Sequence, residues 1–405
     1  MLRNTNLFKV RNEAVKPFTT VWISHMLIEV FLLMHPALVP VFIKEFNLSV
    51  FDAGLIITVP SLCRLIFTLP AGIFADRFGP RRLIILSVLV GGLGAVLVSQ
   101  STTAAFLVFS LSLIMISVTL YHPPGLSILQ GWFSDPKERS AAIGLHGASG
   151  CIGQSLGTIS LGLLLIQFGW RFCYLLFAVP LLAWAAILVR TRTQRLPKRP
   201  PETTQDQISA DDGGVHHSAR KSSLITLGFI VLMASMGLNA LANGSVGAFM
   251  TTYMTSQRHL ALDVASIIFG AGPLVGIVGS LVGGYLSSRF GEKNSLVLIY
   301  VGQAIFLLGL ITIPLTSLAI VSFFTYQLFS NAMWTPASSM VASLADTSSG
   351  GRAYSLYFLS SDGPGAVSPL IAAVLITNFN IVFPFGFAVI LLASNVLLVR
   401  LISAR

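Results

Sequence analysis

The sequence predicts an all-α membrane protein with twelve transmembrane helices in two six-helix repeats, and three observations lead to this fold class. Apolar residues make up 54% of the 405 residues and charged residues only 10%, a balance typical of a chain dissolved in lipid. Apolar runs of about 20 residues, enough to cross roughly 30 Å of hydrocarbon as a helix, recur between short polar breaks. Part of the sequence also repeats at a fixed distance along the chain.

The apolar runs are continuous rather than alternating, which indicates helices and excludes a transmembrane β-barrel. The segment before the first run is polar and that run is long enough to span, so we expect no cleaved signal peptide. The twelve predicted spans lie near 18–43, 52–75, 82–101, 104–131, 141–166, 170–189, 223–250, 262–287, 295–315, 318–343, 353–377 and 381–401.

The formal charge of +10 raises the question of nucleic-acid binding, and the distribution of the 25 Lys and Arg residues answers it. If the N-terminus is cytoplasmic, 21 of them fall in cytoplasmic segments, while Lys44, Arg171 and Arg258 lie outside and Arg64 lies within a helix. This asymmetry is the one that orients membrane proteins during insertion. We therefore expect both termini in the cytoplasm, a bacterial inner membrane as the location, and no nucleic-acid partner.

The chain divides at one long polar segment. Residues 190–222 are rich in Pro, Gly, Gln, Ser and charge and predict a cytoplasmic linker. We expect residues 1–189 to form an N-terminal six-helix half and residues 223–405 a C-terminal six-helix half. His216 and His217 lie in the linker and are interpreted as solvated side chains, and the three cysteines form no metal or disulfide pattern.

An internal repeat supports the two halves. At a shift of 212 residues, the run GIFADRFGPRR beginning at Gly72 falls over GYLSSRFGEK beginning at Gly284. One further residue of shift places His122 and Pro123 over Thr335 and Pro336. Two similar halves related by an axis along the membrane normal are expected to form a binding site at their interface, near the bilayer midplane.

The run GIFADRFGPRR resembles the signature loop of the major facilitator superfamily, and the resemblance implies a twelve-helix transporter with this loop as a gate. Gly72 would permit close helix approach, and Asp76 at a helix end would pair with basic groups. Simple positive-inside chemistry would explain the arginines but neither Asp76 nor the glycine spacing. The predicted gating residues are Gly72, Asp76, Arg77, Gly79, Arg81 and Arg82, with Arg289 and Gly291 in the second copy.

The stretches SHMLIEVFLLMHPALVPVFIKEFNLS and YHPPGLSILQGWFSDPKERSAAIGLHGASGCIGQSLG are similar to the first and the fourth-to-fifth helices of fosmidomycin-resistance-type exporters. Proton-driven exporters of the superfamily usually carry Gly-Pro in helix 5, where this sequence has Gly157 and Thr158. The departure disfavours a drug antiporter.

Ionisable residues inside the spans are costly and are candidates for function. Counting from the cytoplasmic ends places Arg64, Glu29 and His122 about 18–20 Å deep, in one layer, with Asp362 at about 15 Å. His25 lies four residues before Glu29 and shares its helix face. Arg64 could neutralise Glu29, whereas Asp362 has no visible basic partner, and His35 and His146 are interpreted as packing residues.

The C-terminal half offers neutral polar groups. Asn239 and Asn243 repeat the four-residue spacing in helix 7, and helix 10 carries Tyr326, Gln327, Asn331 and Trp334. The resemblance implies that helices 1, 4, 7 and 10 line the cavity, which suits a mixed polar and aromatic site. Tyr326 and Trp334 could equally be core residues.

These observations predict a secondary transporter that works as a monomer by alternating access, without a cofactor or metal and not as an enzyme. We expect Arg64 to hold a small organic anion, and Glu29, Asp362 or a histidine to carry a coupled proton. No GxxxxGK[ST] loop is present for ATP. One alternative is proton-coupled drug efflux. The other is a membrane-embedded metal hydrolase, which the absence of a metal-ligand spacing among His25, Glu29 and His122 disfavours.

Overall fold

The computed structural model describes residues 12–133, 136–191, 226–344 and 350–402. Within these ranges the chain is helical and contains no strand. The helices are α1 (Asn12–Glu29), α2 (Met34–Ala37), α3 (Val39–Glu45), α4 (Val50–Phe78), α5 (Pro80–Ser99), α6 (Ala104–Trp132), α7 (Pro136–Arg190), α8 (Leu227–Gln257), α9 (Leu262–Phe290), α10 (Glu292–Thr312), α11 (Thr316–Ala332), α12 (Trp334–Leu344), α13 (Gly350–Asn378) and α14 (Phe383–Arg400).

The described helices account for twelve spans. Ten stretches among them are long and apolar enough to cross a membrane. One of these, Ala141–Arg190, is 50 residues long and counts twice, because Gly169 (φ 74°, ψ 164°) leaves the helical conformation and α7 turns back on itself. The short helices α11 and α12 follow one another directly and supply one more span. The predicted all-α fold of twelve transmembrane helices is confirmed.

The first predicted helix, 18–43, is broken rather than continuous. Pro36 and Pro40 each lack a backbone N–H, and their rings clash with the carbonyl four residues earlier, so α1 ends before them. The N–H of Leu32 instead bonds the carbonyl oxygen of Glu29 at 3.1 Å. The break leaves Glu29 as the last residue of α1, buried inside the protein.

The repeat seen in the sequence is also a structural repeat. Gly79 joins α4 to α5 with φ 86°, and Gly291 joins α9 to α10 with φ 75°, a conformation that favours glycine. Arg81 donates hydrogen bonds to backbone carbonyls at the C-terminal end of α7. Lys293 donates to carbonyls at the C-terminal end of α14. The two basic residues thus tie matching helices together at the negative end of the helix dipole.

The other basic residues of the predicted gating loop stay near the surface. The guanidinium carbon of Arg77 lies 5.6 Å from the ring centroid of Phe78, and that of Arg289 lies 5.7 Å from the ring centroid of Phe290. Arg82 is exposed. Arg77 and Arg289 therefore occupy equivalent environments in the two copies of the loop.

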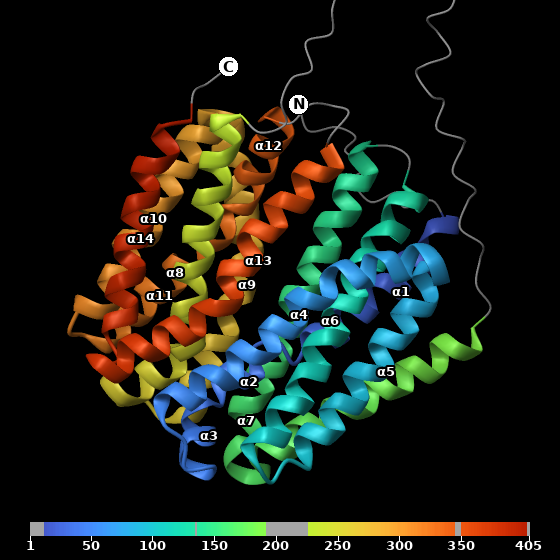
Figure 1. Cartoon of the computed structure of the whole chain (residues 1–405), viewed down its shortest axis with the longest axis horizontal. Helices are drawn as coiled ribbons and strands as arrows, with labels where there is room; N and C mark the ends of the chain where they lie inside the picture. The colour runs from blue at the N-terminus through green and yellow to red at the C-terminus, as the bar shows by residue number, and fades with distance from the viewer. Residues whose placement is uncertain (1–11, 134–135, 192–225, 345–349, 403–405) are drawn as a thin grey trace, which may run out of the picture.

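Two groups of helices lie side by side, α1–α7 and α8–α14 (Figure 1), with α2, α3 and the turn of α7 at the end opposite the marked chain ends. Contacts between the groups lie at this end. A Cβ placed on Gly162 of α7 would be 2.6 Å from the carbonyl oxygen of Asp263, at the start of α9. The hydroxyl of Thr251 in α8 donates to the carbonyl oxygen of Pro36 in α2 at 3.2 Å.

At the end that carries the termini, the glycine expected to permit close helix approach has no close neighbour. A Cβ on Gly72 would meet no described atom within 4 Å, and the same holds for Gly144 and Gly147 of α7. The close approach expected at Gly72 is therefore absent among the described residues in this conformation, in which the two groups meet at the opposite end, and its role as a gate stays a prediction. The side chain of Asp76, with its predicted ion pairs, lies outside the described residues.

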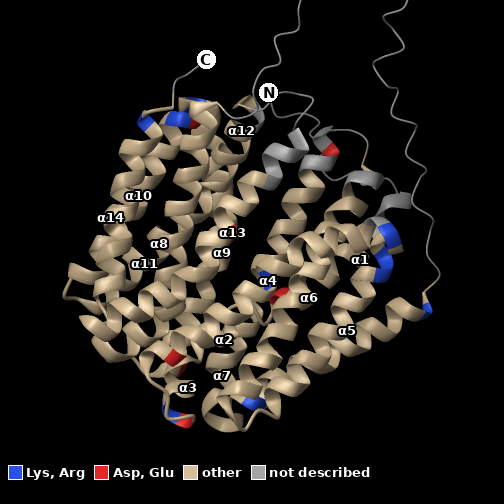
Figure 2. Ribbon diagram, viewed as in Figure 1, with Lys and Arg blue, Asp and Glu red and all other residues tan. Residues whose placement is uncertain are grey.

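Among the described residues, charged residues gather at the two ends of the helices, and few lie between them (Figure 2). Most of the predicted linker, 190–222, lies outside the described residues. The few charges in the middle of the bundle are therefore candidates for a functional site.

Candidate functional site

Two histidines and a glutamate converge among the N-terminal helices. Oε1 of Glu29 lies 3.7 Å from Nε2 of His25 and 3.3 Å from Nε2 of His122. His25 and Glu29 occupy one face of α1, as their spacing predicts, while His122 comes from α6. The Glu29 side chain is 3% exposed and that of His122 is 32% exposed, so the cluster is reached from the His122 side.

Backbone contacts fix the orientation of His25. Its Nδ1 lies 2.8 Å from the carbonyl oxygen of His146, which can only accept a hydrogen bond, so Nδ1 carries the hydrogen. The two imidazole rings stack with centroids 4.0 Å apart and an angle of 2° between their planes. In the neutral ring, Nε2 then directs its lone pair towards Glu29. His146, interpreted as a packing residue, packs against His25.

Side chains that the sequence analysis did not select complete this cluster. Gln154 of α7 donates from Nε2 to Oε2 of Glu29 at 2.9 Å. The hydroxyl of Tyr121 donates to the carbonyl oxygen of Val21 at 2.6 Å and lies 3.0 Å from Nε2 of His146. The sequence does contain a signal for Gln154, because its amide lies within an apolar run. A polar group inside the membrane must form hydrogen bonds with other groups of the protein.

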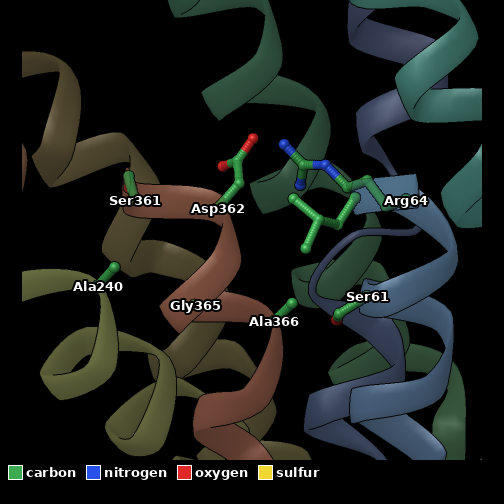
Figure 3. A pocket seen from close by; sticks show the side chains of 8 residues that line it. Ser61, Arg64, Ala240, Ser361, Asp362, Gly365 and Ala366 are labelled. Carbon is green, nitrogen blue, oxygen red and sulfur yellow. The ribbon is translucent and has the colours of Figure 1, made fainter. Parts of the chain in front are cut away.

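Arg64 and Asp362 face one another across a separate cavity of about 230 Å³ between the two groups of helices. Figure 3 shows the guanidinium of Arg64, from α4, and the carboxylate of Asp362, from α13, extending towards each other. The cavity is lined by Ser61, Arg64 and Leu65 of α4, Ala240 of α8, and Ser361, Asp362, Gly365 and Ala366 of α13.

This arrangement corrects one expectation and weakens another. Asp362 was expected to have no basic residue near it at its depth, whereas Arg64 of the other group lines the same cavity. The carboxylate of Glu29 makes its described ion contacts with His25 and His122 rather than with Arg64. Depth along single helices could not reveal either partner, because partners depend on how helices are rotated against one another.

A hydrogen-bond network joins three helices of the C-terminal group. Oδ1 of Asn243 accepts from the Tyr326 hydroxyl at 2.5 Å and from Oγ of Ser330 at 2.7 Å. Nδ2 of Asn243 lies 3.0 Å from Oδ1 of Asn239 and 3.3 Å from Oε1 of Gln303. Three predicted candidates are thus brought together, while Ser330 and the buried Gln303 of α10 were missed.

Two further candidates of this half, Asn331 and Trp334, lie apart from the network. Asn331 donates from Nδ2 to the carbonyl oxygen of Gln327 at 2.9 Å, and its amide packs against Gly276 of α9. Trp334 is 41% exposed, and its ring meets Tyr357 edge-on at a centroid distance of 6.2 Å. The Trp334 ring is therefore not joined to the Asn243 network.

His25, Glu29 and His122 are also the residues able to hold a metal among those the structure describes. One ligand atom from each lies within 4.8 Å of the others. The sequence showed no metal-ligand spacing, because the third ligand comes from a distant helix. The convergence itself is a property of the fold.

Comparison with known proteins gives consistent matches. The family model described as Major Facilitator Superfamily matches residues 21–369 and 232–404. The hexuronate transporter of Bacillus subtilis is 22% identical over 262 residues, covering 62% of this chain and 59% of the relative. The methyl viologen resistance protein SmvA of Salmonella typhimurium is 31% identical over 121 residues, covering 30% of this chain and 24% of the relative. The matches therefore span less than two thirds of both relatives.

A bacterial homologue of the human lysosomal transporter Spinster, solved in an inward-facing and occupied conformation, has a similar fold. The TM-score is 0.78 and the match covers 96% of each chain, at 15% sequence identity. The likeness extends over nearly the whole chain and concerns the fold alone.

Proposed function

This chain belongs to the major facilitator superfamily and is a multi-pass membrane transporter, and we propose that it carries a small organic anion together with protons by alternating access. Family membership indicates a transporter rather than an enzyme. The convergence of His25, Glu29 and His122 would suit a metal hydrolase, but that alternative has no support from the relatives.

The cavity between Arg64 and Asp362 is the observation that carries this proposal. An arginine among membrane-spanning helices needs a negative partner, and its planar fork fits a carboxylate or phosphonate in a bidentate manner. The cavity of about 230 Å³ is smaller than the roughly 300–1,000 Å³ typical of drug-sized pockets, which favours a small solute. A relative named for hexuronate, a carboxylate, supports the same class.

The position of Asp362 supports the proposal of proton coupling. An anion that binds Arg64 must lie close to the carboxylate of Asp362, and two negative charges in one small cavity repel. A proton on Asp362 removes that repulsion, so the anion and the proton favour each other's binding. This linkage would move the solute with the proton gradient.

We place the protein in a bacterial inner membrane as a monomer with both termini in the cytoplasm, because the basic residues concentrate in the corresponding loops. The contacts between the two groups of helices at the opposite end then make this conformation closed to the outside. Transport requires those contacts to break while the end near the termini closes.

Drug efflux is the second candidate, favoured by the similarity to a methyl viologen resistance protein. Such a function would use Asp362 as a partner for a cation rather than Arg64 as a partner for an anion. A thermal-shift screen of the solubilised protein separates anion transport from drug efflux, since bound ligand raises the unfolding temperature. The screen compares three classes of compound: small carboxylates such as hexuronates, small phosphonates, and cationic drugs.

Variants of the cavity test the anion proposal with the best carboxylate from the screen. Arg64→Lys keeps the charge and loses the bidentate geometry, so affinity should fall by about tenfold or more. Asp362→Asn should bind and exchange the anion but fail to accumulate it in proteoliposomes under an imposed pH gradient, because an amide cannot cycle a proton.

Two results would contradict the proposal. Unchanged anion affinity in Arg64→Lys would remove the arginine from recognition. Full gradient-driven accumulation by Asp362→Asn would remove Asp362 from the coupling step.

A further inference from the structure

We propose that His25, Glu29 and His122 form a binding site for one zinc-like divalent transition-metal ion, distinct from the Arg64–Asp362 cavity. The proposal goes beyond solute transport and rests on the placement of three ligand atoms by two helices. Imidazole nitrogen suits zinc and its neighbours in the first transition row, whereas magnesium and calcium prefer oxygen alone.

The distances fit a tetrahedral ion. Ligand bonds of about 2.0–2.2 Å place neighbouring ligand atoms of a tetrahedron roughly 3.3–3.5 Å apart. Oε1 of Glu29 lies 3.3 Å from Nε2 of His122 and 3.7 Å from Nε2 of His25. These two edges to Glu29 differ from the tetrahedral spacing by a few tenths of an ångström at most, and all three ligand atoms lie within 4.8 Å of one another.

The arrangement calls for a cation at its centre. Nδ1 of His25 carries the hydrogen that faces the carbonyl oxygen of His146, so Nε2 of the neutral ring points a lone pair at the carboxylate of Glu29. Two acceptors facing each other repel unless a cation lies between them. A proton can bridge one pair of atoms, whereas a metal ion engages Glu29, His25 and His122 together.

Outer contacts resemble those that hold metal ligands in place. The carbonyl oxygen of His146 fixes the tautomer and the direction of the His25 ring. The amide of Gln154 holds Oε2 of Glu29 at 2.9 Å, which leaves Oε1 for the ion. Three protein ligands and a fourth position for water are typical of an accessible zinc site rather than a closed structural one.

The ion would enter on the side of His122, whose side chain is 32% exposed while Glu29 is 3% exposed. Arg64 is the charge that opposes binding, because it lies close enough to His122 to act on it electrostatically. Asp362, facing Arg64 across the cavity, offsets part of that repulsion. We therefore expect Arg64→Gln to bind the metal at least as tightly as the unmodified protein.

The test uses the full-length protein in detergent, stripped with a chelator and titrated with Co²⁺ and Zn²⁺. His216 and His217 of the linker are replaced by Ala throughout, so that adjacent linker histidines do not contribute. We expect about one Co²⁺ per chain, with the visible absorption bands of tetrahedral cobalt that Zn²⁺ abolishes, and a higher unfolding temperature with metal.

Ligand variants locate the ion. His122→Ala and Glu29→Gln should each lose at least about 100-fold in Co²⁺ affinity, and Gln154→Ala about 10- to 100-fold. His122→Cys should retain tetrahedral binding because a thiolate replaces the imidazole, which separates loss of a ligand from loss of folding. His259→Ala, at an exposed histidine in the loop between α8 and α9, is the matched control and should bind as before.

Absence of stoichiometric Co²⁺ and Zn²⁺ binding would overturn the proposal and leave a shared proton as the cation. Unchanged affinity in His122→Ala would overturn it as well. Because metal binding is read from absorption and affinity, its failure is distinguishable from a failure of anion transport, which the Arg64 and Asp362 variants report.

Discussion

Gly162 offers a direct test of the contact between the two groups of helices. In Gly162→Ala, the new Cβ would lie 2.6 Å from the carbonyl oxygen of Asp263 and 2.7 Å from Cγ1 of Ile267, both in α9. Overpacking of this kind costs about 1–3 kcal/mol in the conformation described here. Alanine also gains up to about 1 kcal/mol of helix propensity over glycine. That gain is shared by every conformation in which α7 stays helical, so it cancels from the equilibrium between them.

The substitution should therefore shift the conformational equilibrium away from this state by about 5- to 150-fold. Two controls lie on the same helix. Gly147→Ala meets no described atom within 4 Å in this conformation, so it should not shift the equilibrium away from it. Gly153→Ala collides with the backbone of Met26 within the N-terminal group, so it should lower the unfolding temperature without changing the conformational balance.

Spin labels measure the shift. Lys44 and His259 are exposed near the contacting ends of the N-terminal and C-terminal groups, and cysteines at both positions report the separation between the groups by pulsed electron paramagnetic resonance. The background lacks Cys63, Cys151 and Cys173. We expect a larger population at long distance in Gly162→Ala than in Gly147→Ala. Identical distance distributions in these two variants would refute the argument that this contact closes one end of the protein.

The remaining predictions concern topology and the Asn243 network. A cysteine at position 259 should react with an impermeant reagent added to whole cells and one at Gln205 should not, because 190–222 is expected in the cytoplasm; labelling at 205 in intact cells would reverse the orientation. Tyr326→Phe removes the donor 2.5 Å from Oδ1 of Asn243 and should lower the free energy of unfolding by about 1 kcal/mol, measured from the detergent-denaturation midpoint. An unchanged midpoint would show that this hydrogen bond adds no net stability.

Local sequence patterns were sufficient for the fold and for part of the site. The apolar runs predict the spans because a helix in lipid must satisfy its own backbone and bury apolar side chains. Gly79 and Gly291 were readable as a repeated turn, and both adopt a positive φ. His25 and Glu29 were paired correctly because a separation of four residues brings side chains together on any helix.

The break after Glu29 was encoded by Pro36 and Pro40, although the length of the apolar run suggested one continuous helix. Hydropathy measures how apolar a segment is and does not report where its backbone hydrogen bonds fail.

Only the tertiary structure decided which polar groups meet across different helices. It brought His122 of α6 and Gln154 of α7 to Glu29, and it placed Asp362 of α13 opposite Arg64 of α4. The sequence sets the depth of each residue, at a fixed rise along its helix. The direction in which a side chain points depends on how each helix is rotated and packed, and that is fixed by close contacts between residues far apart in the chain.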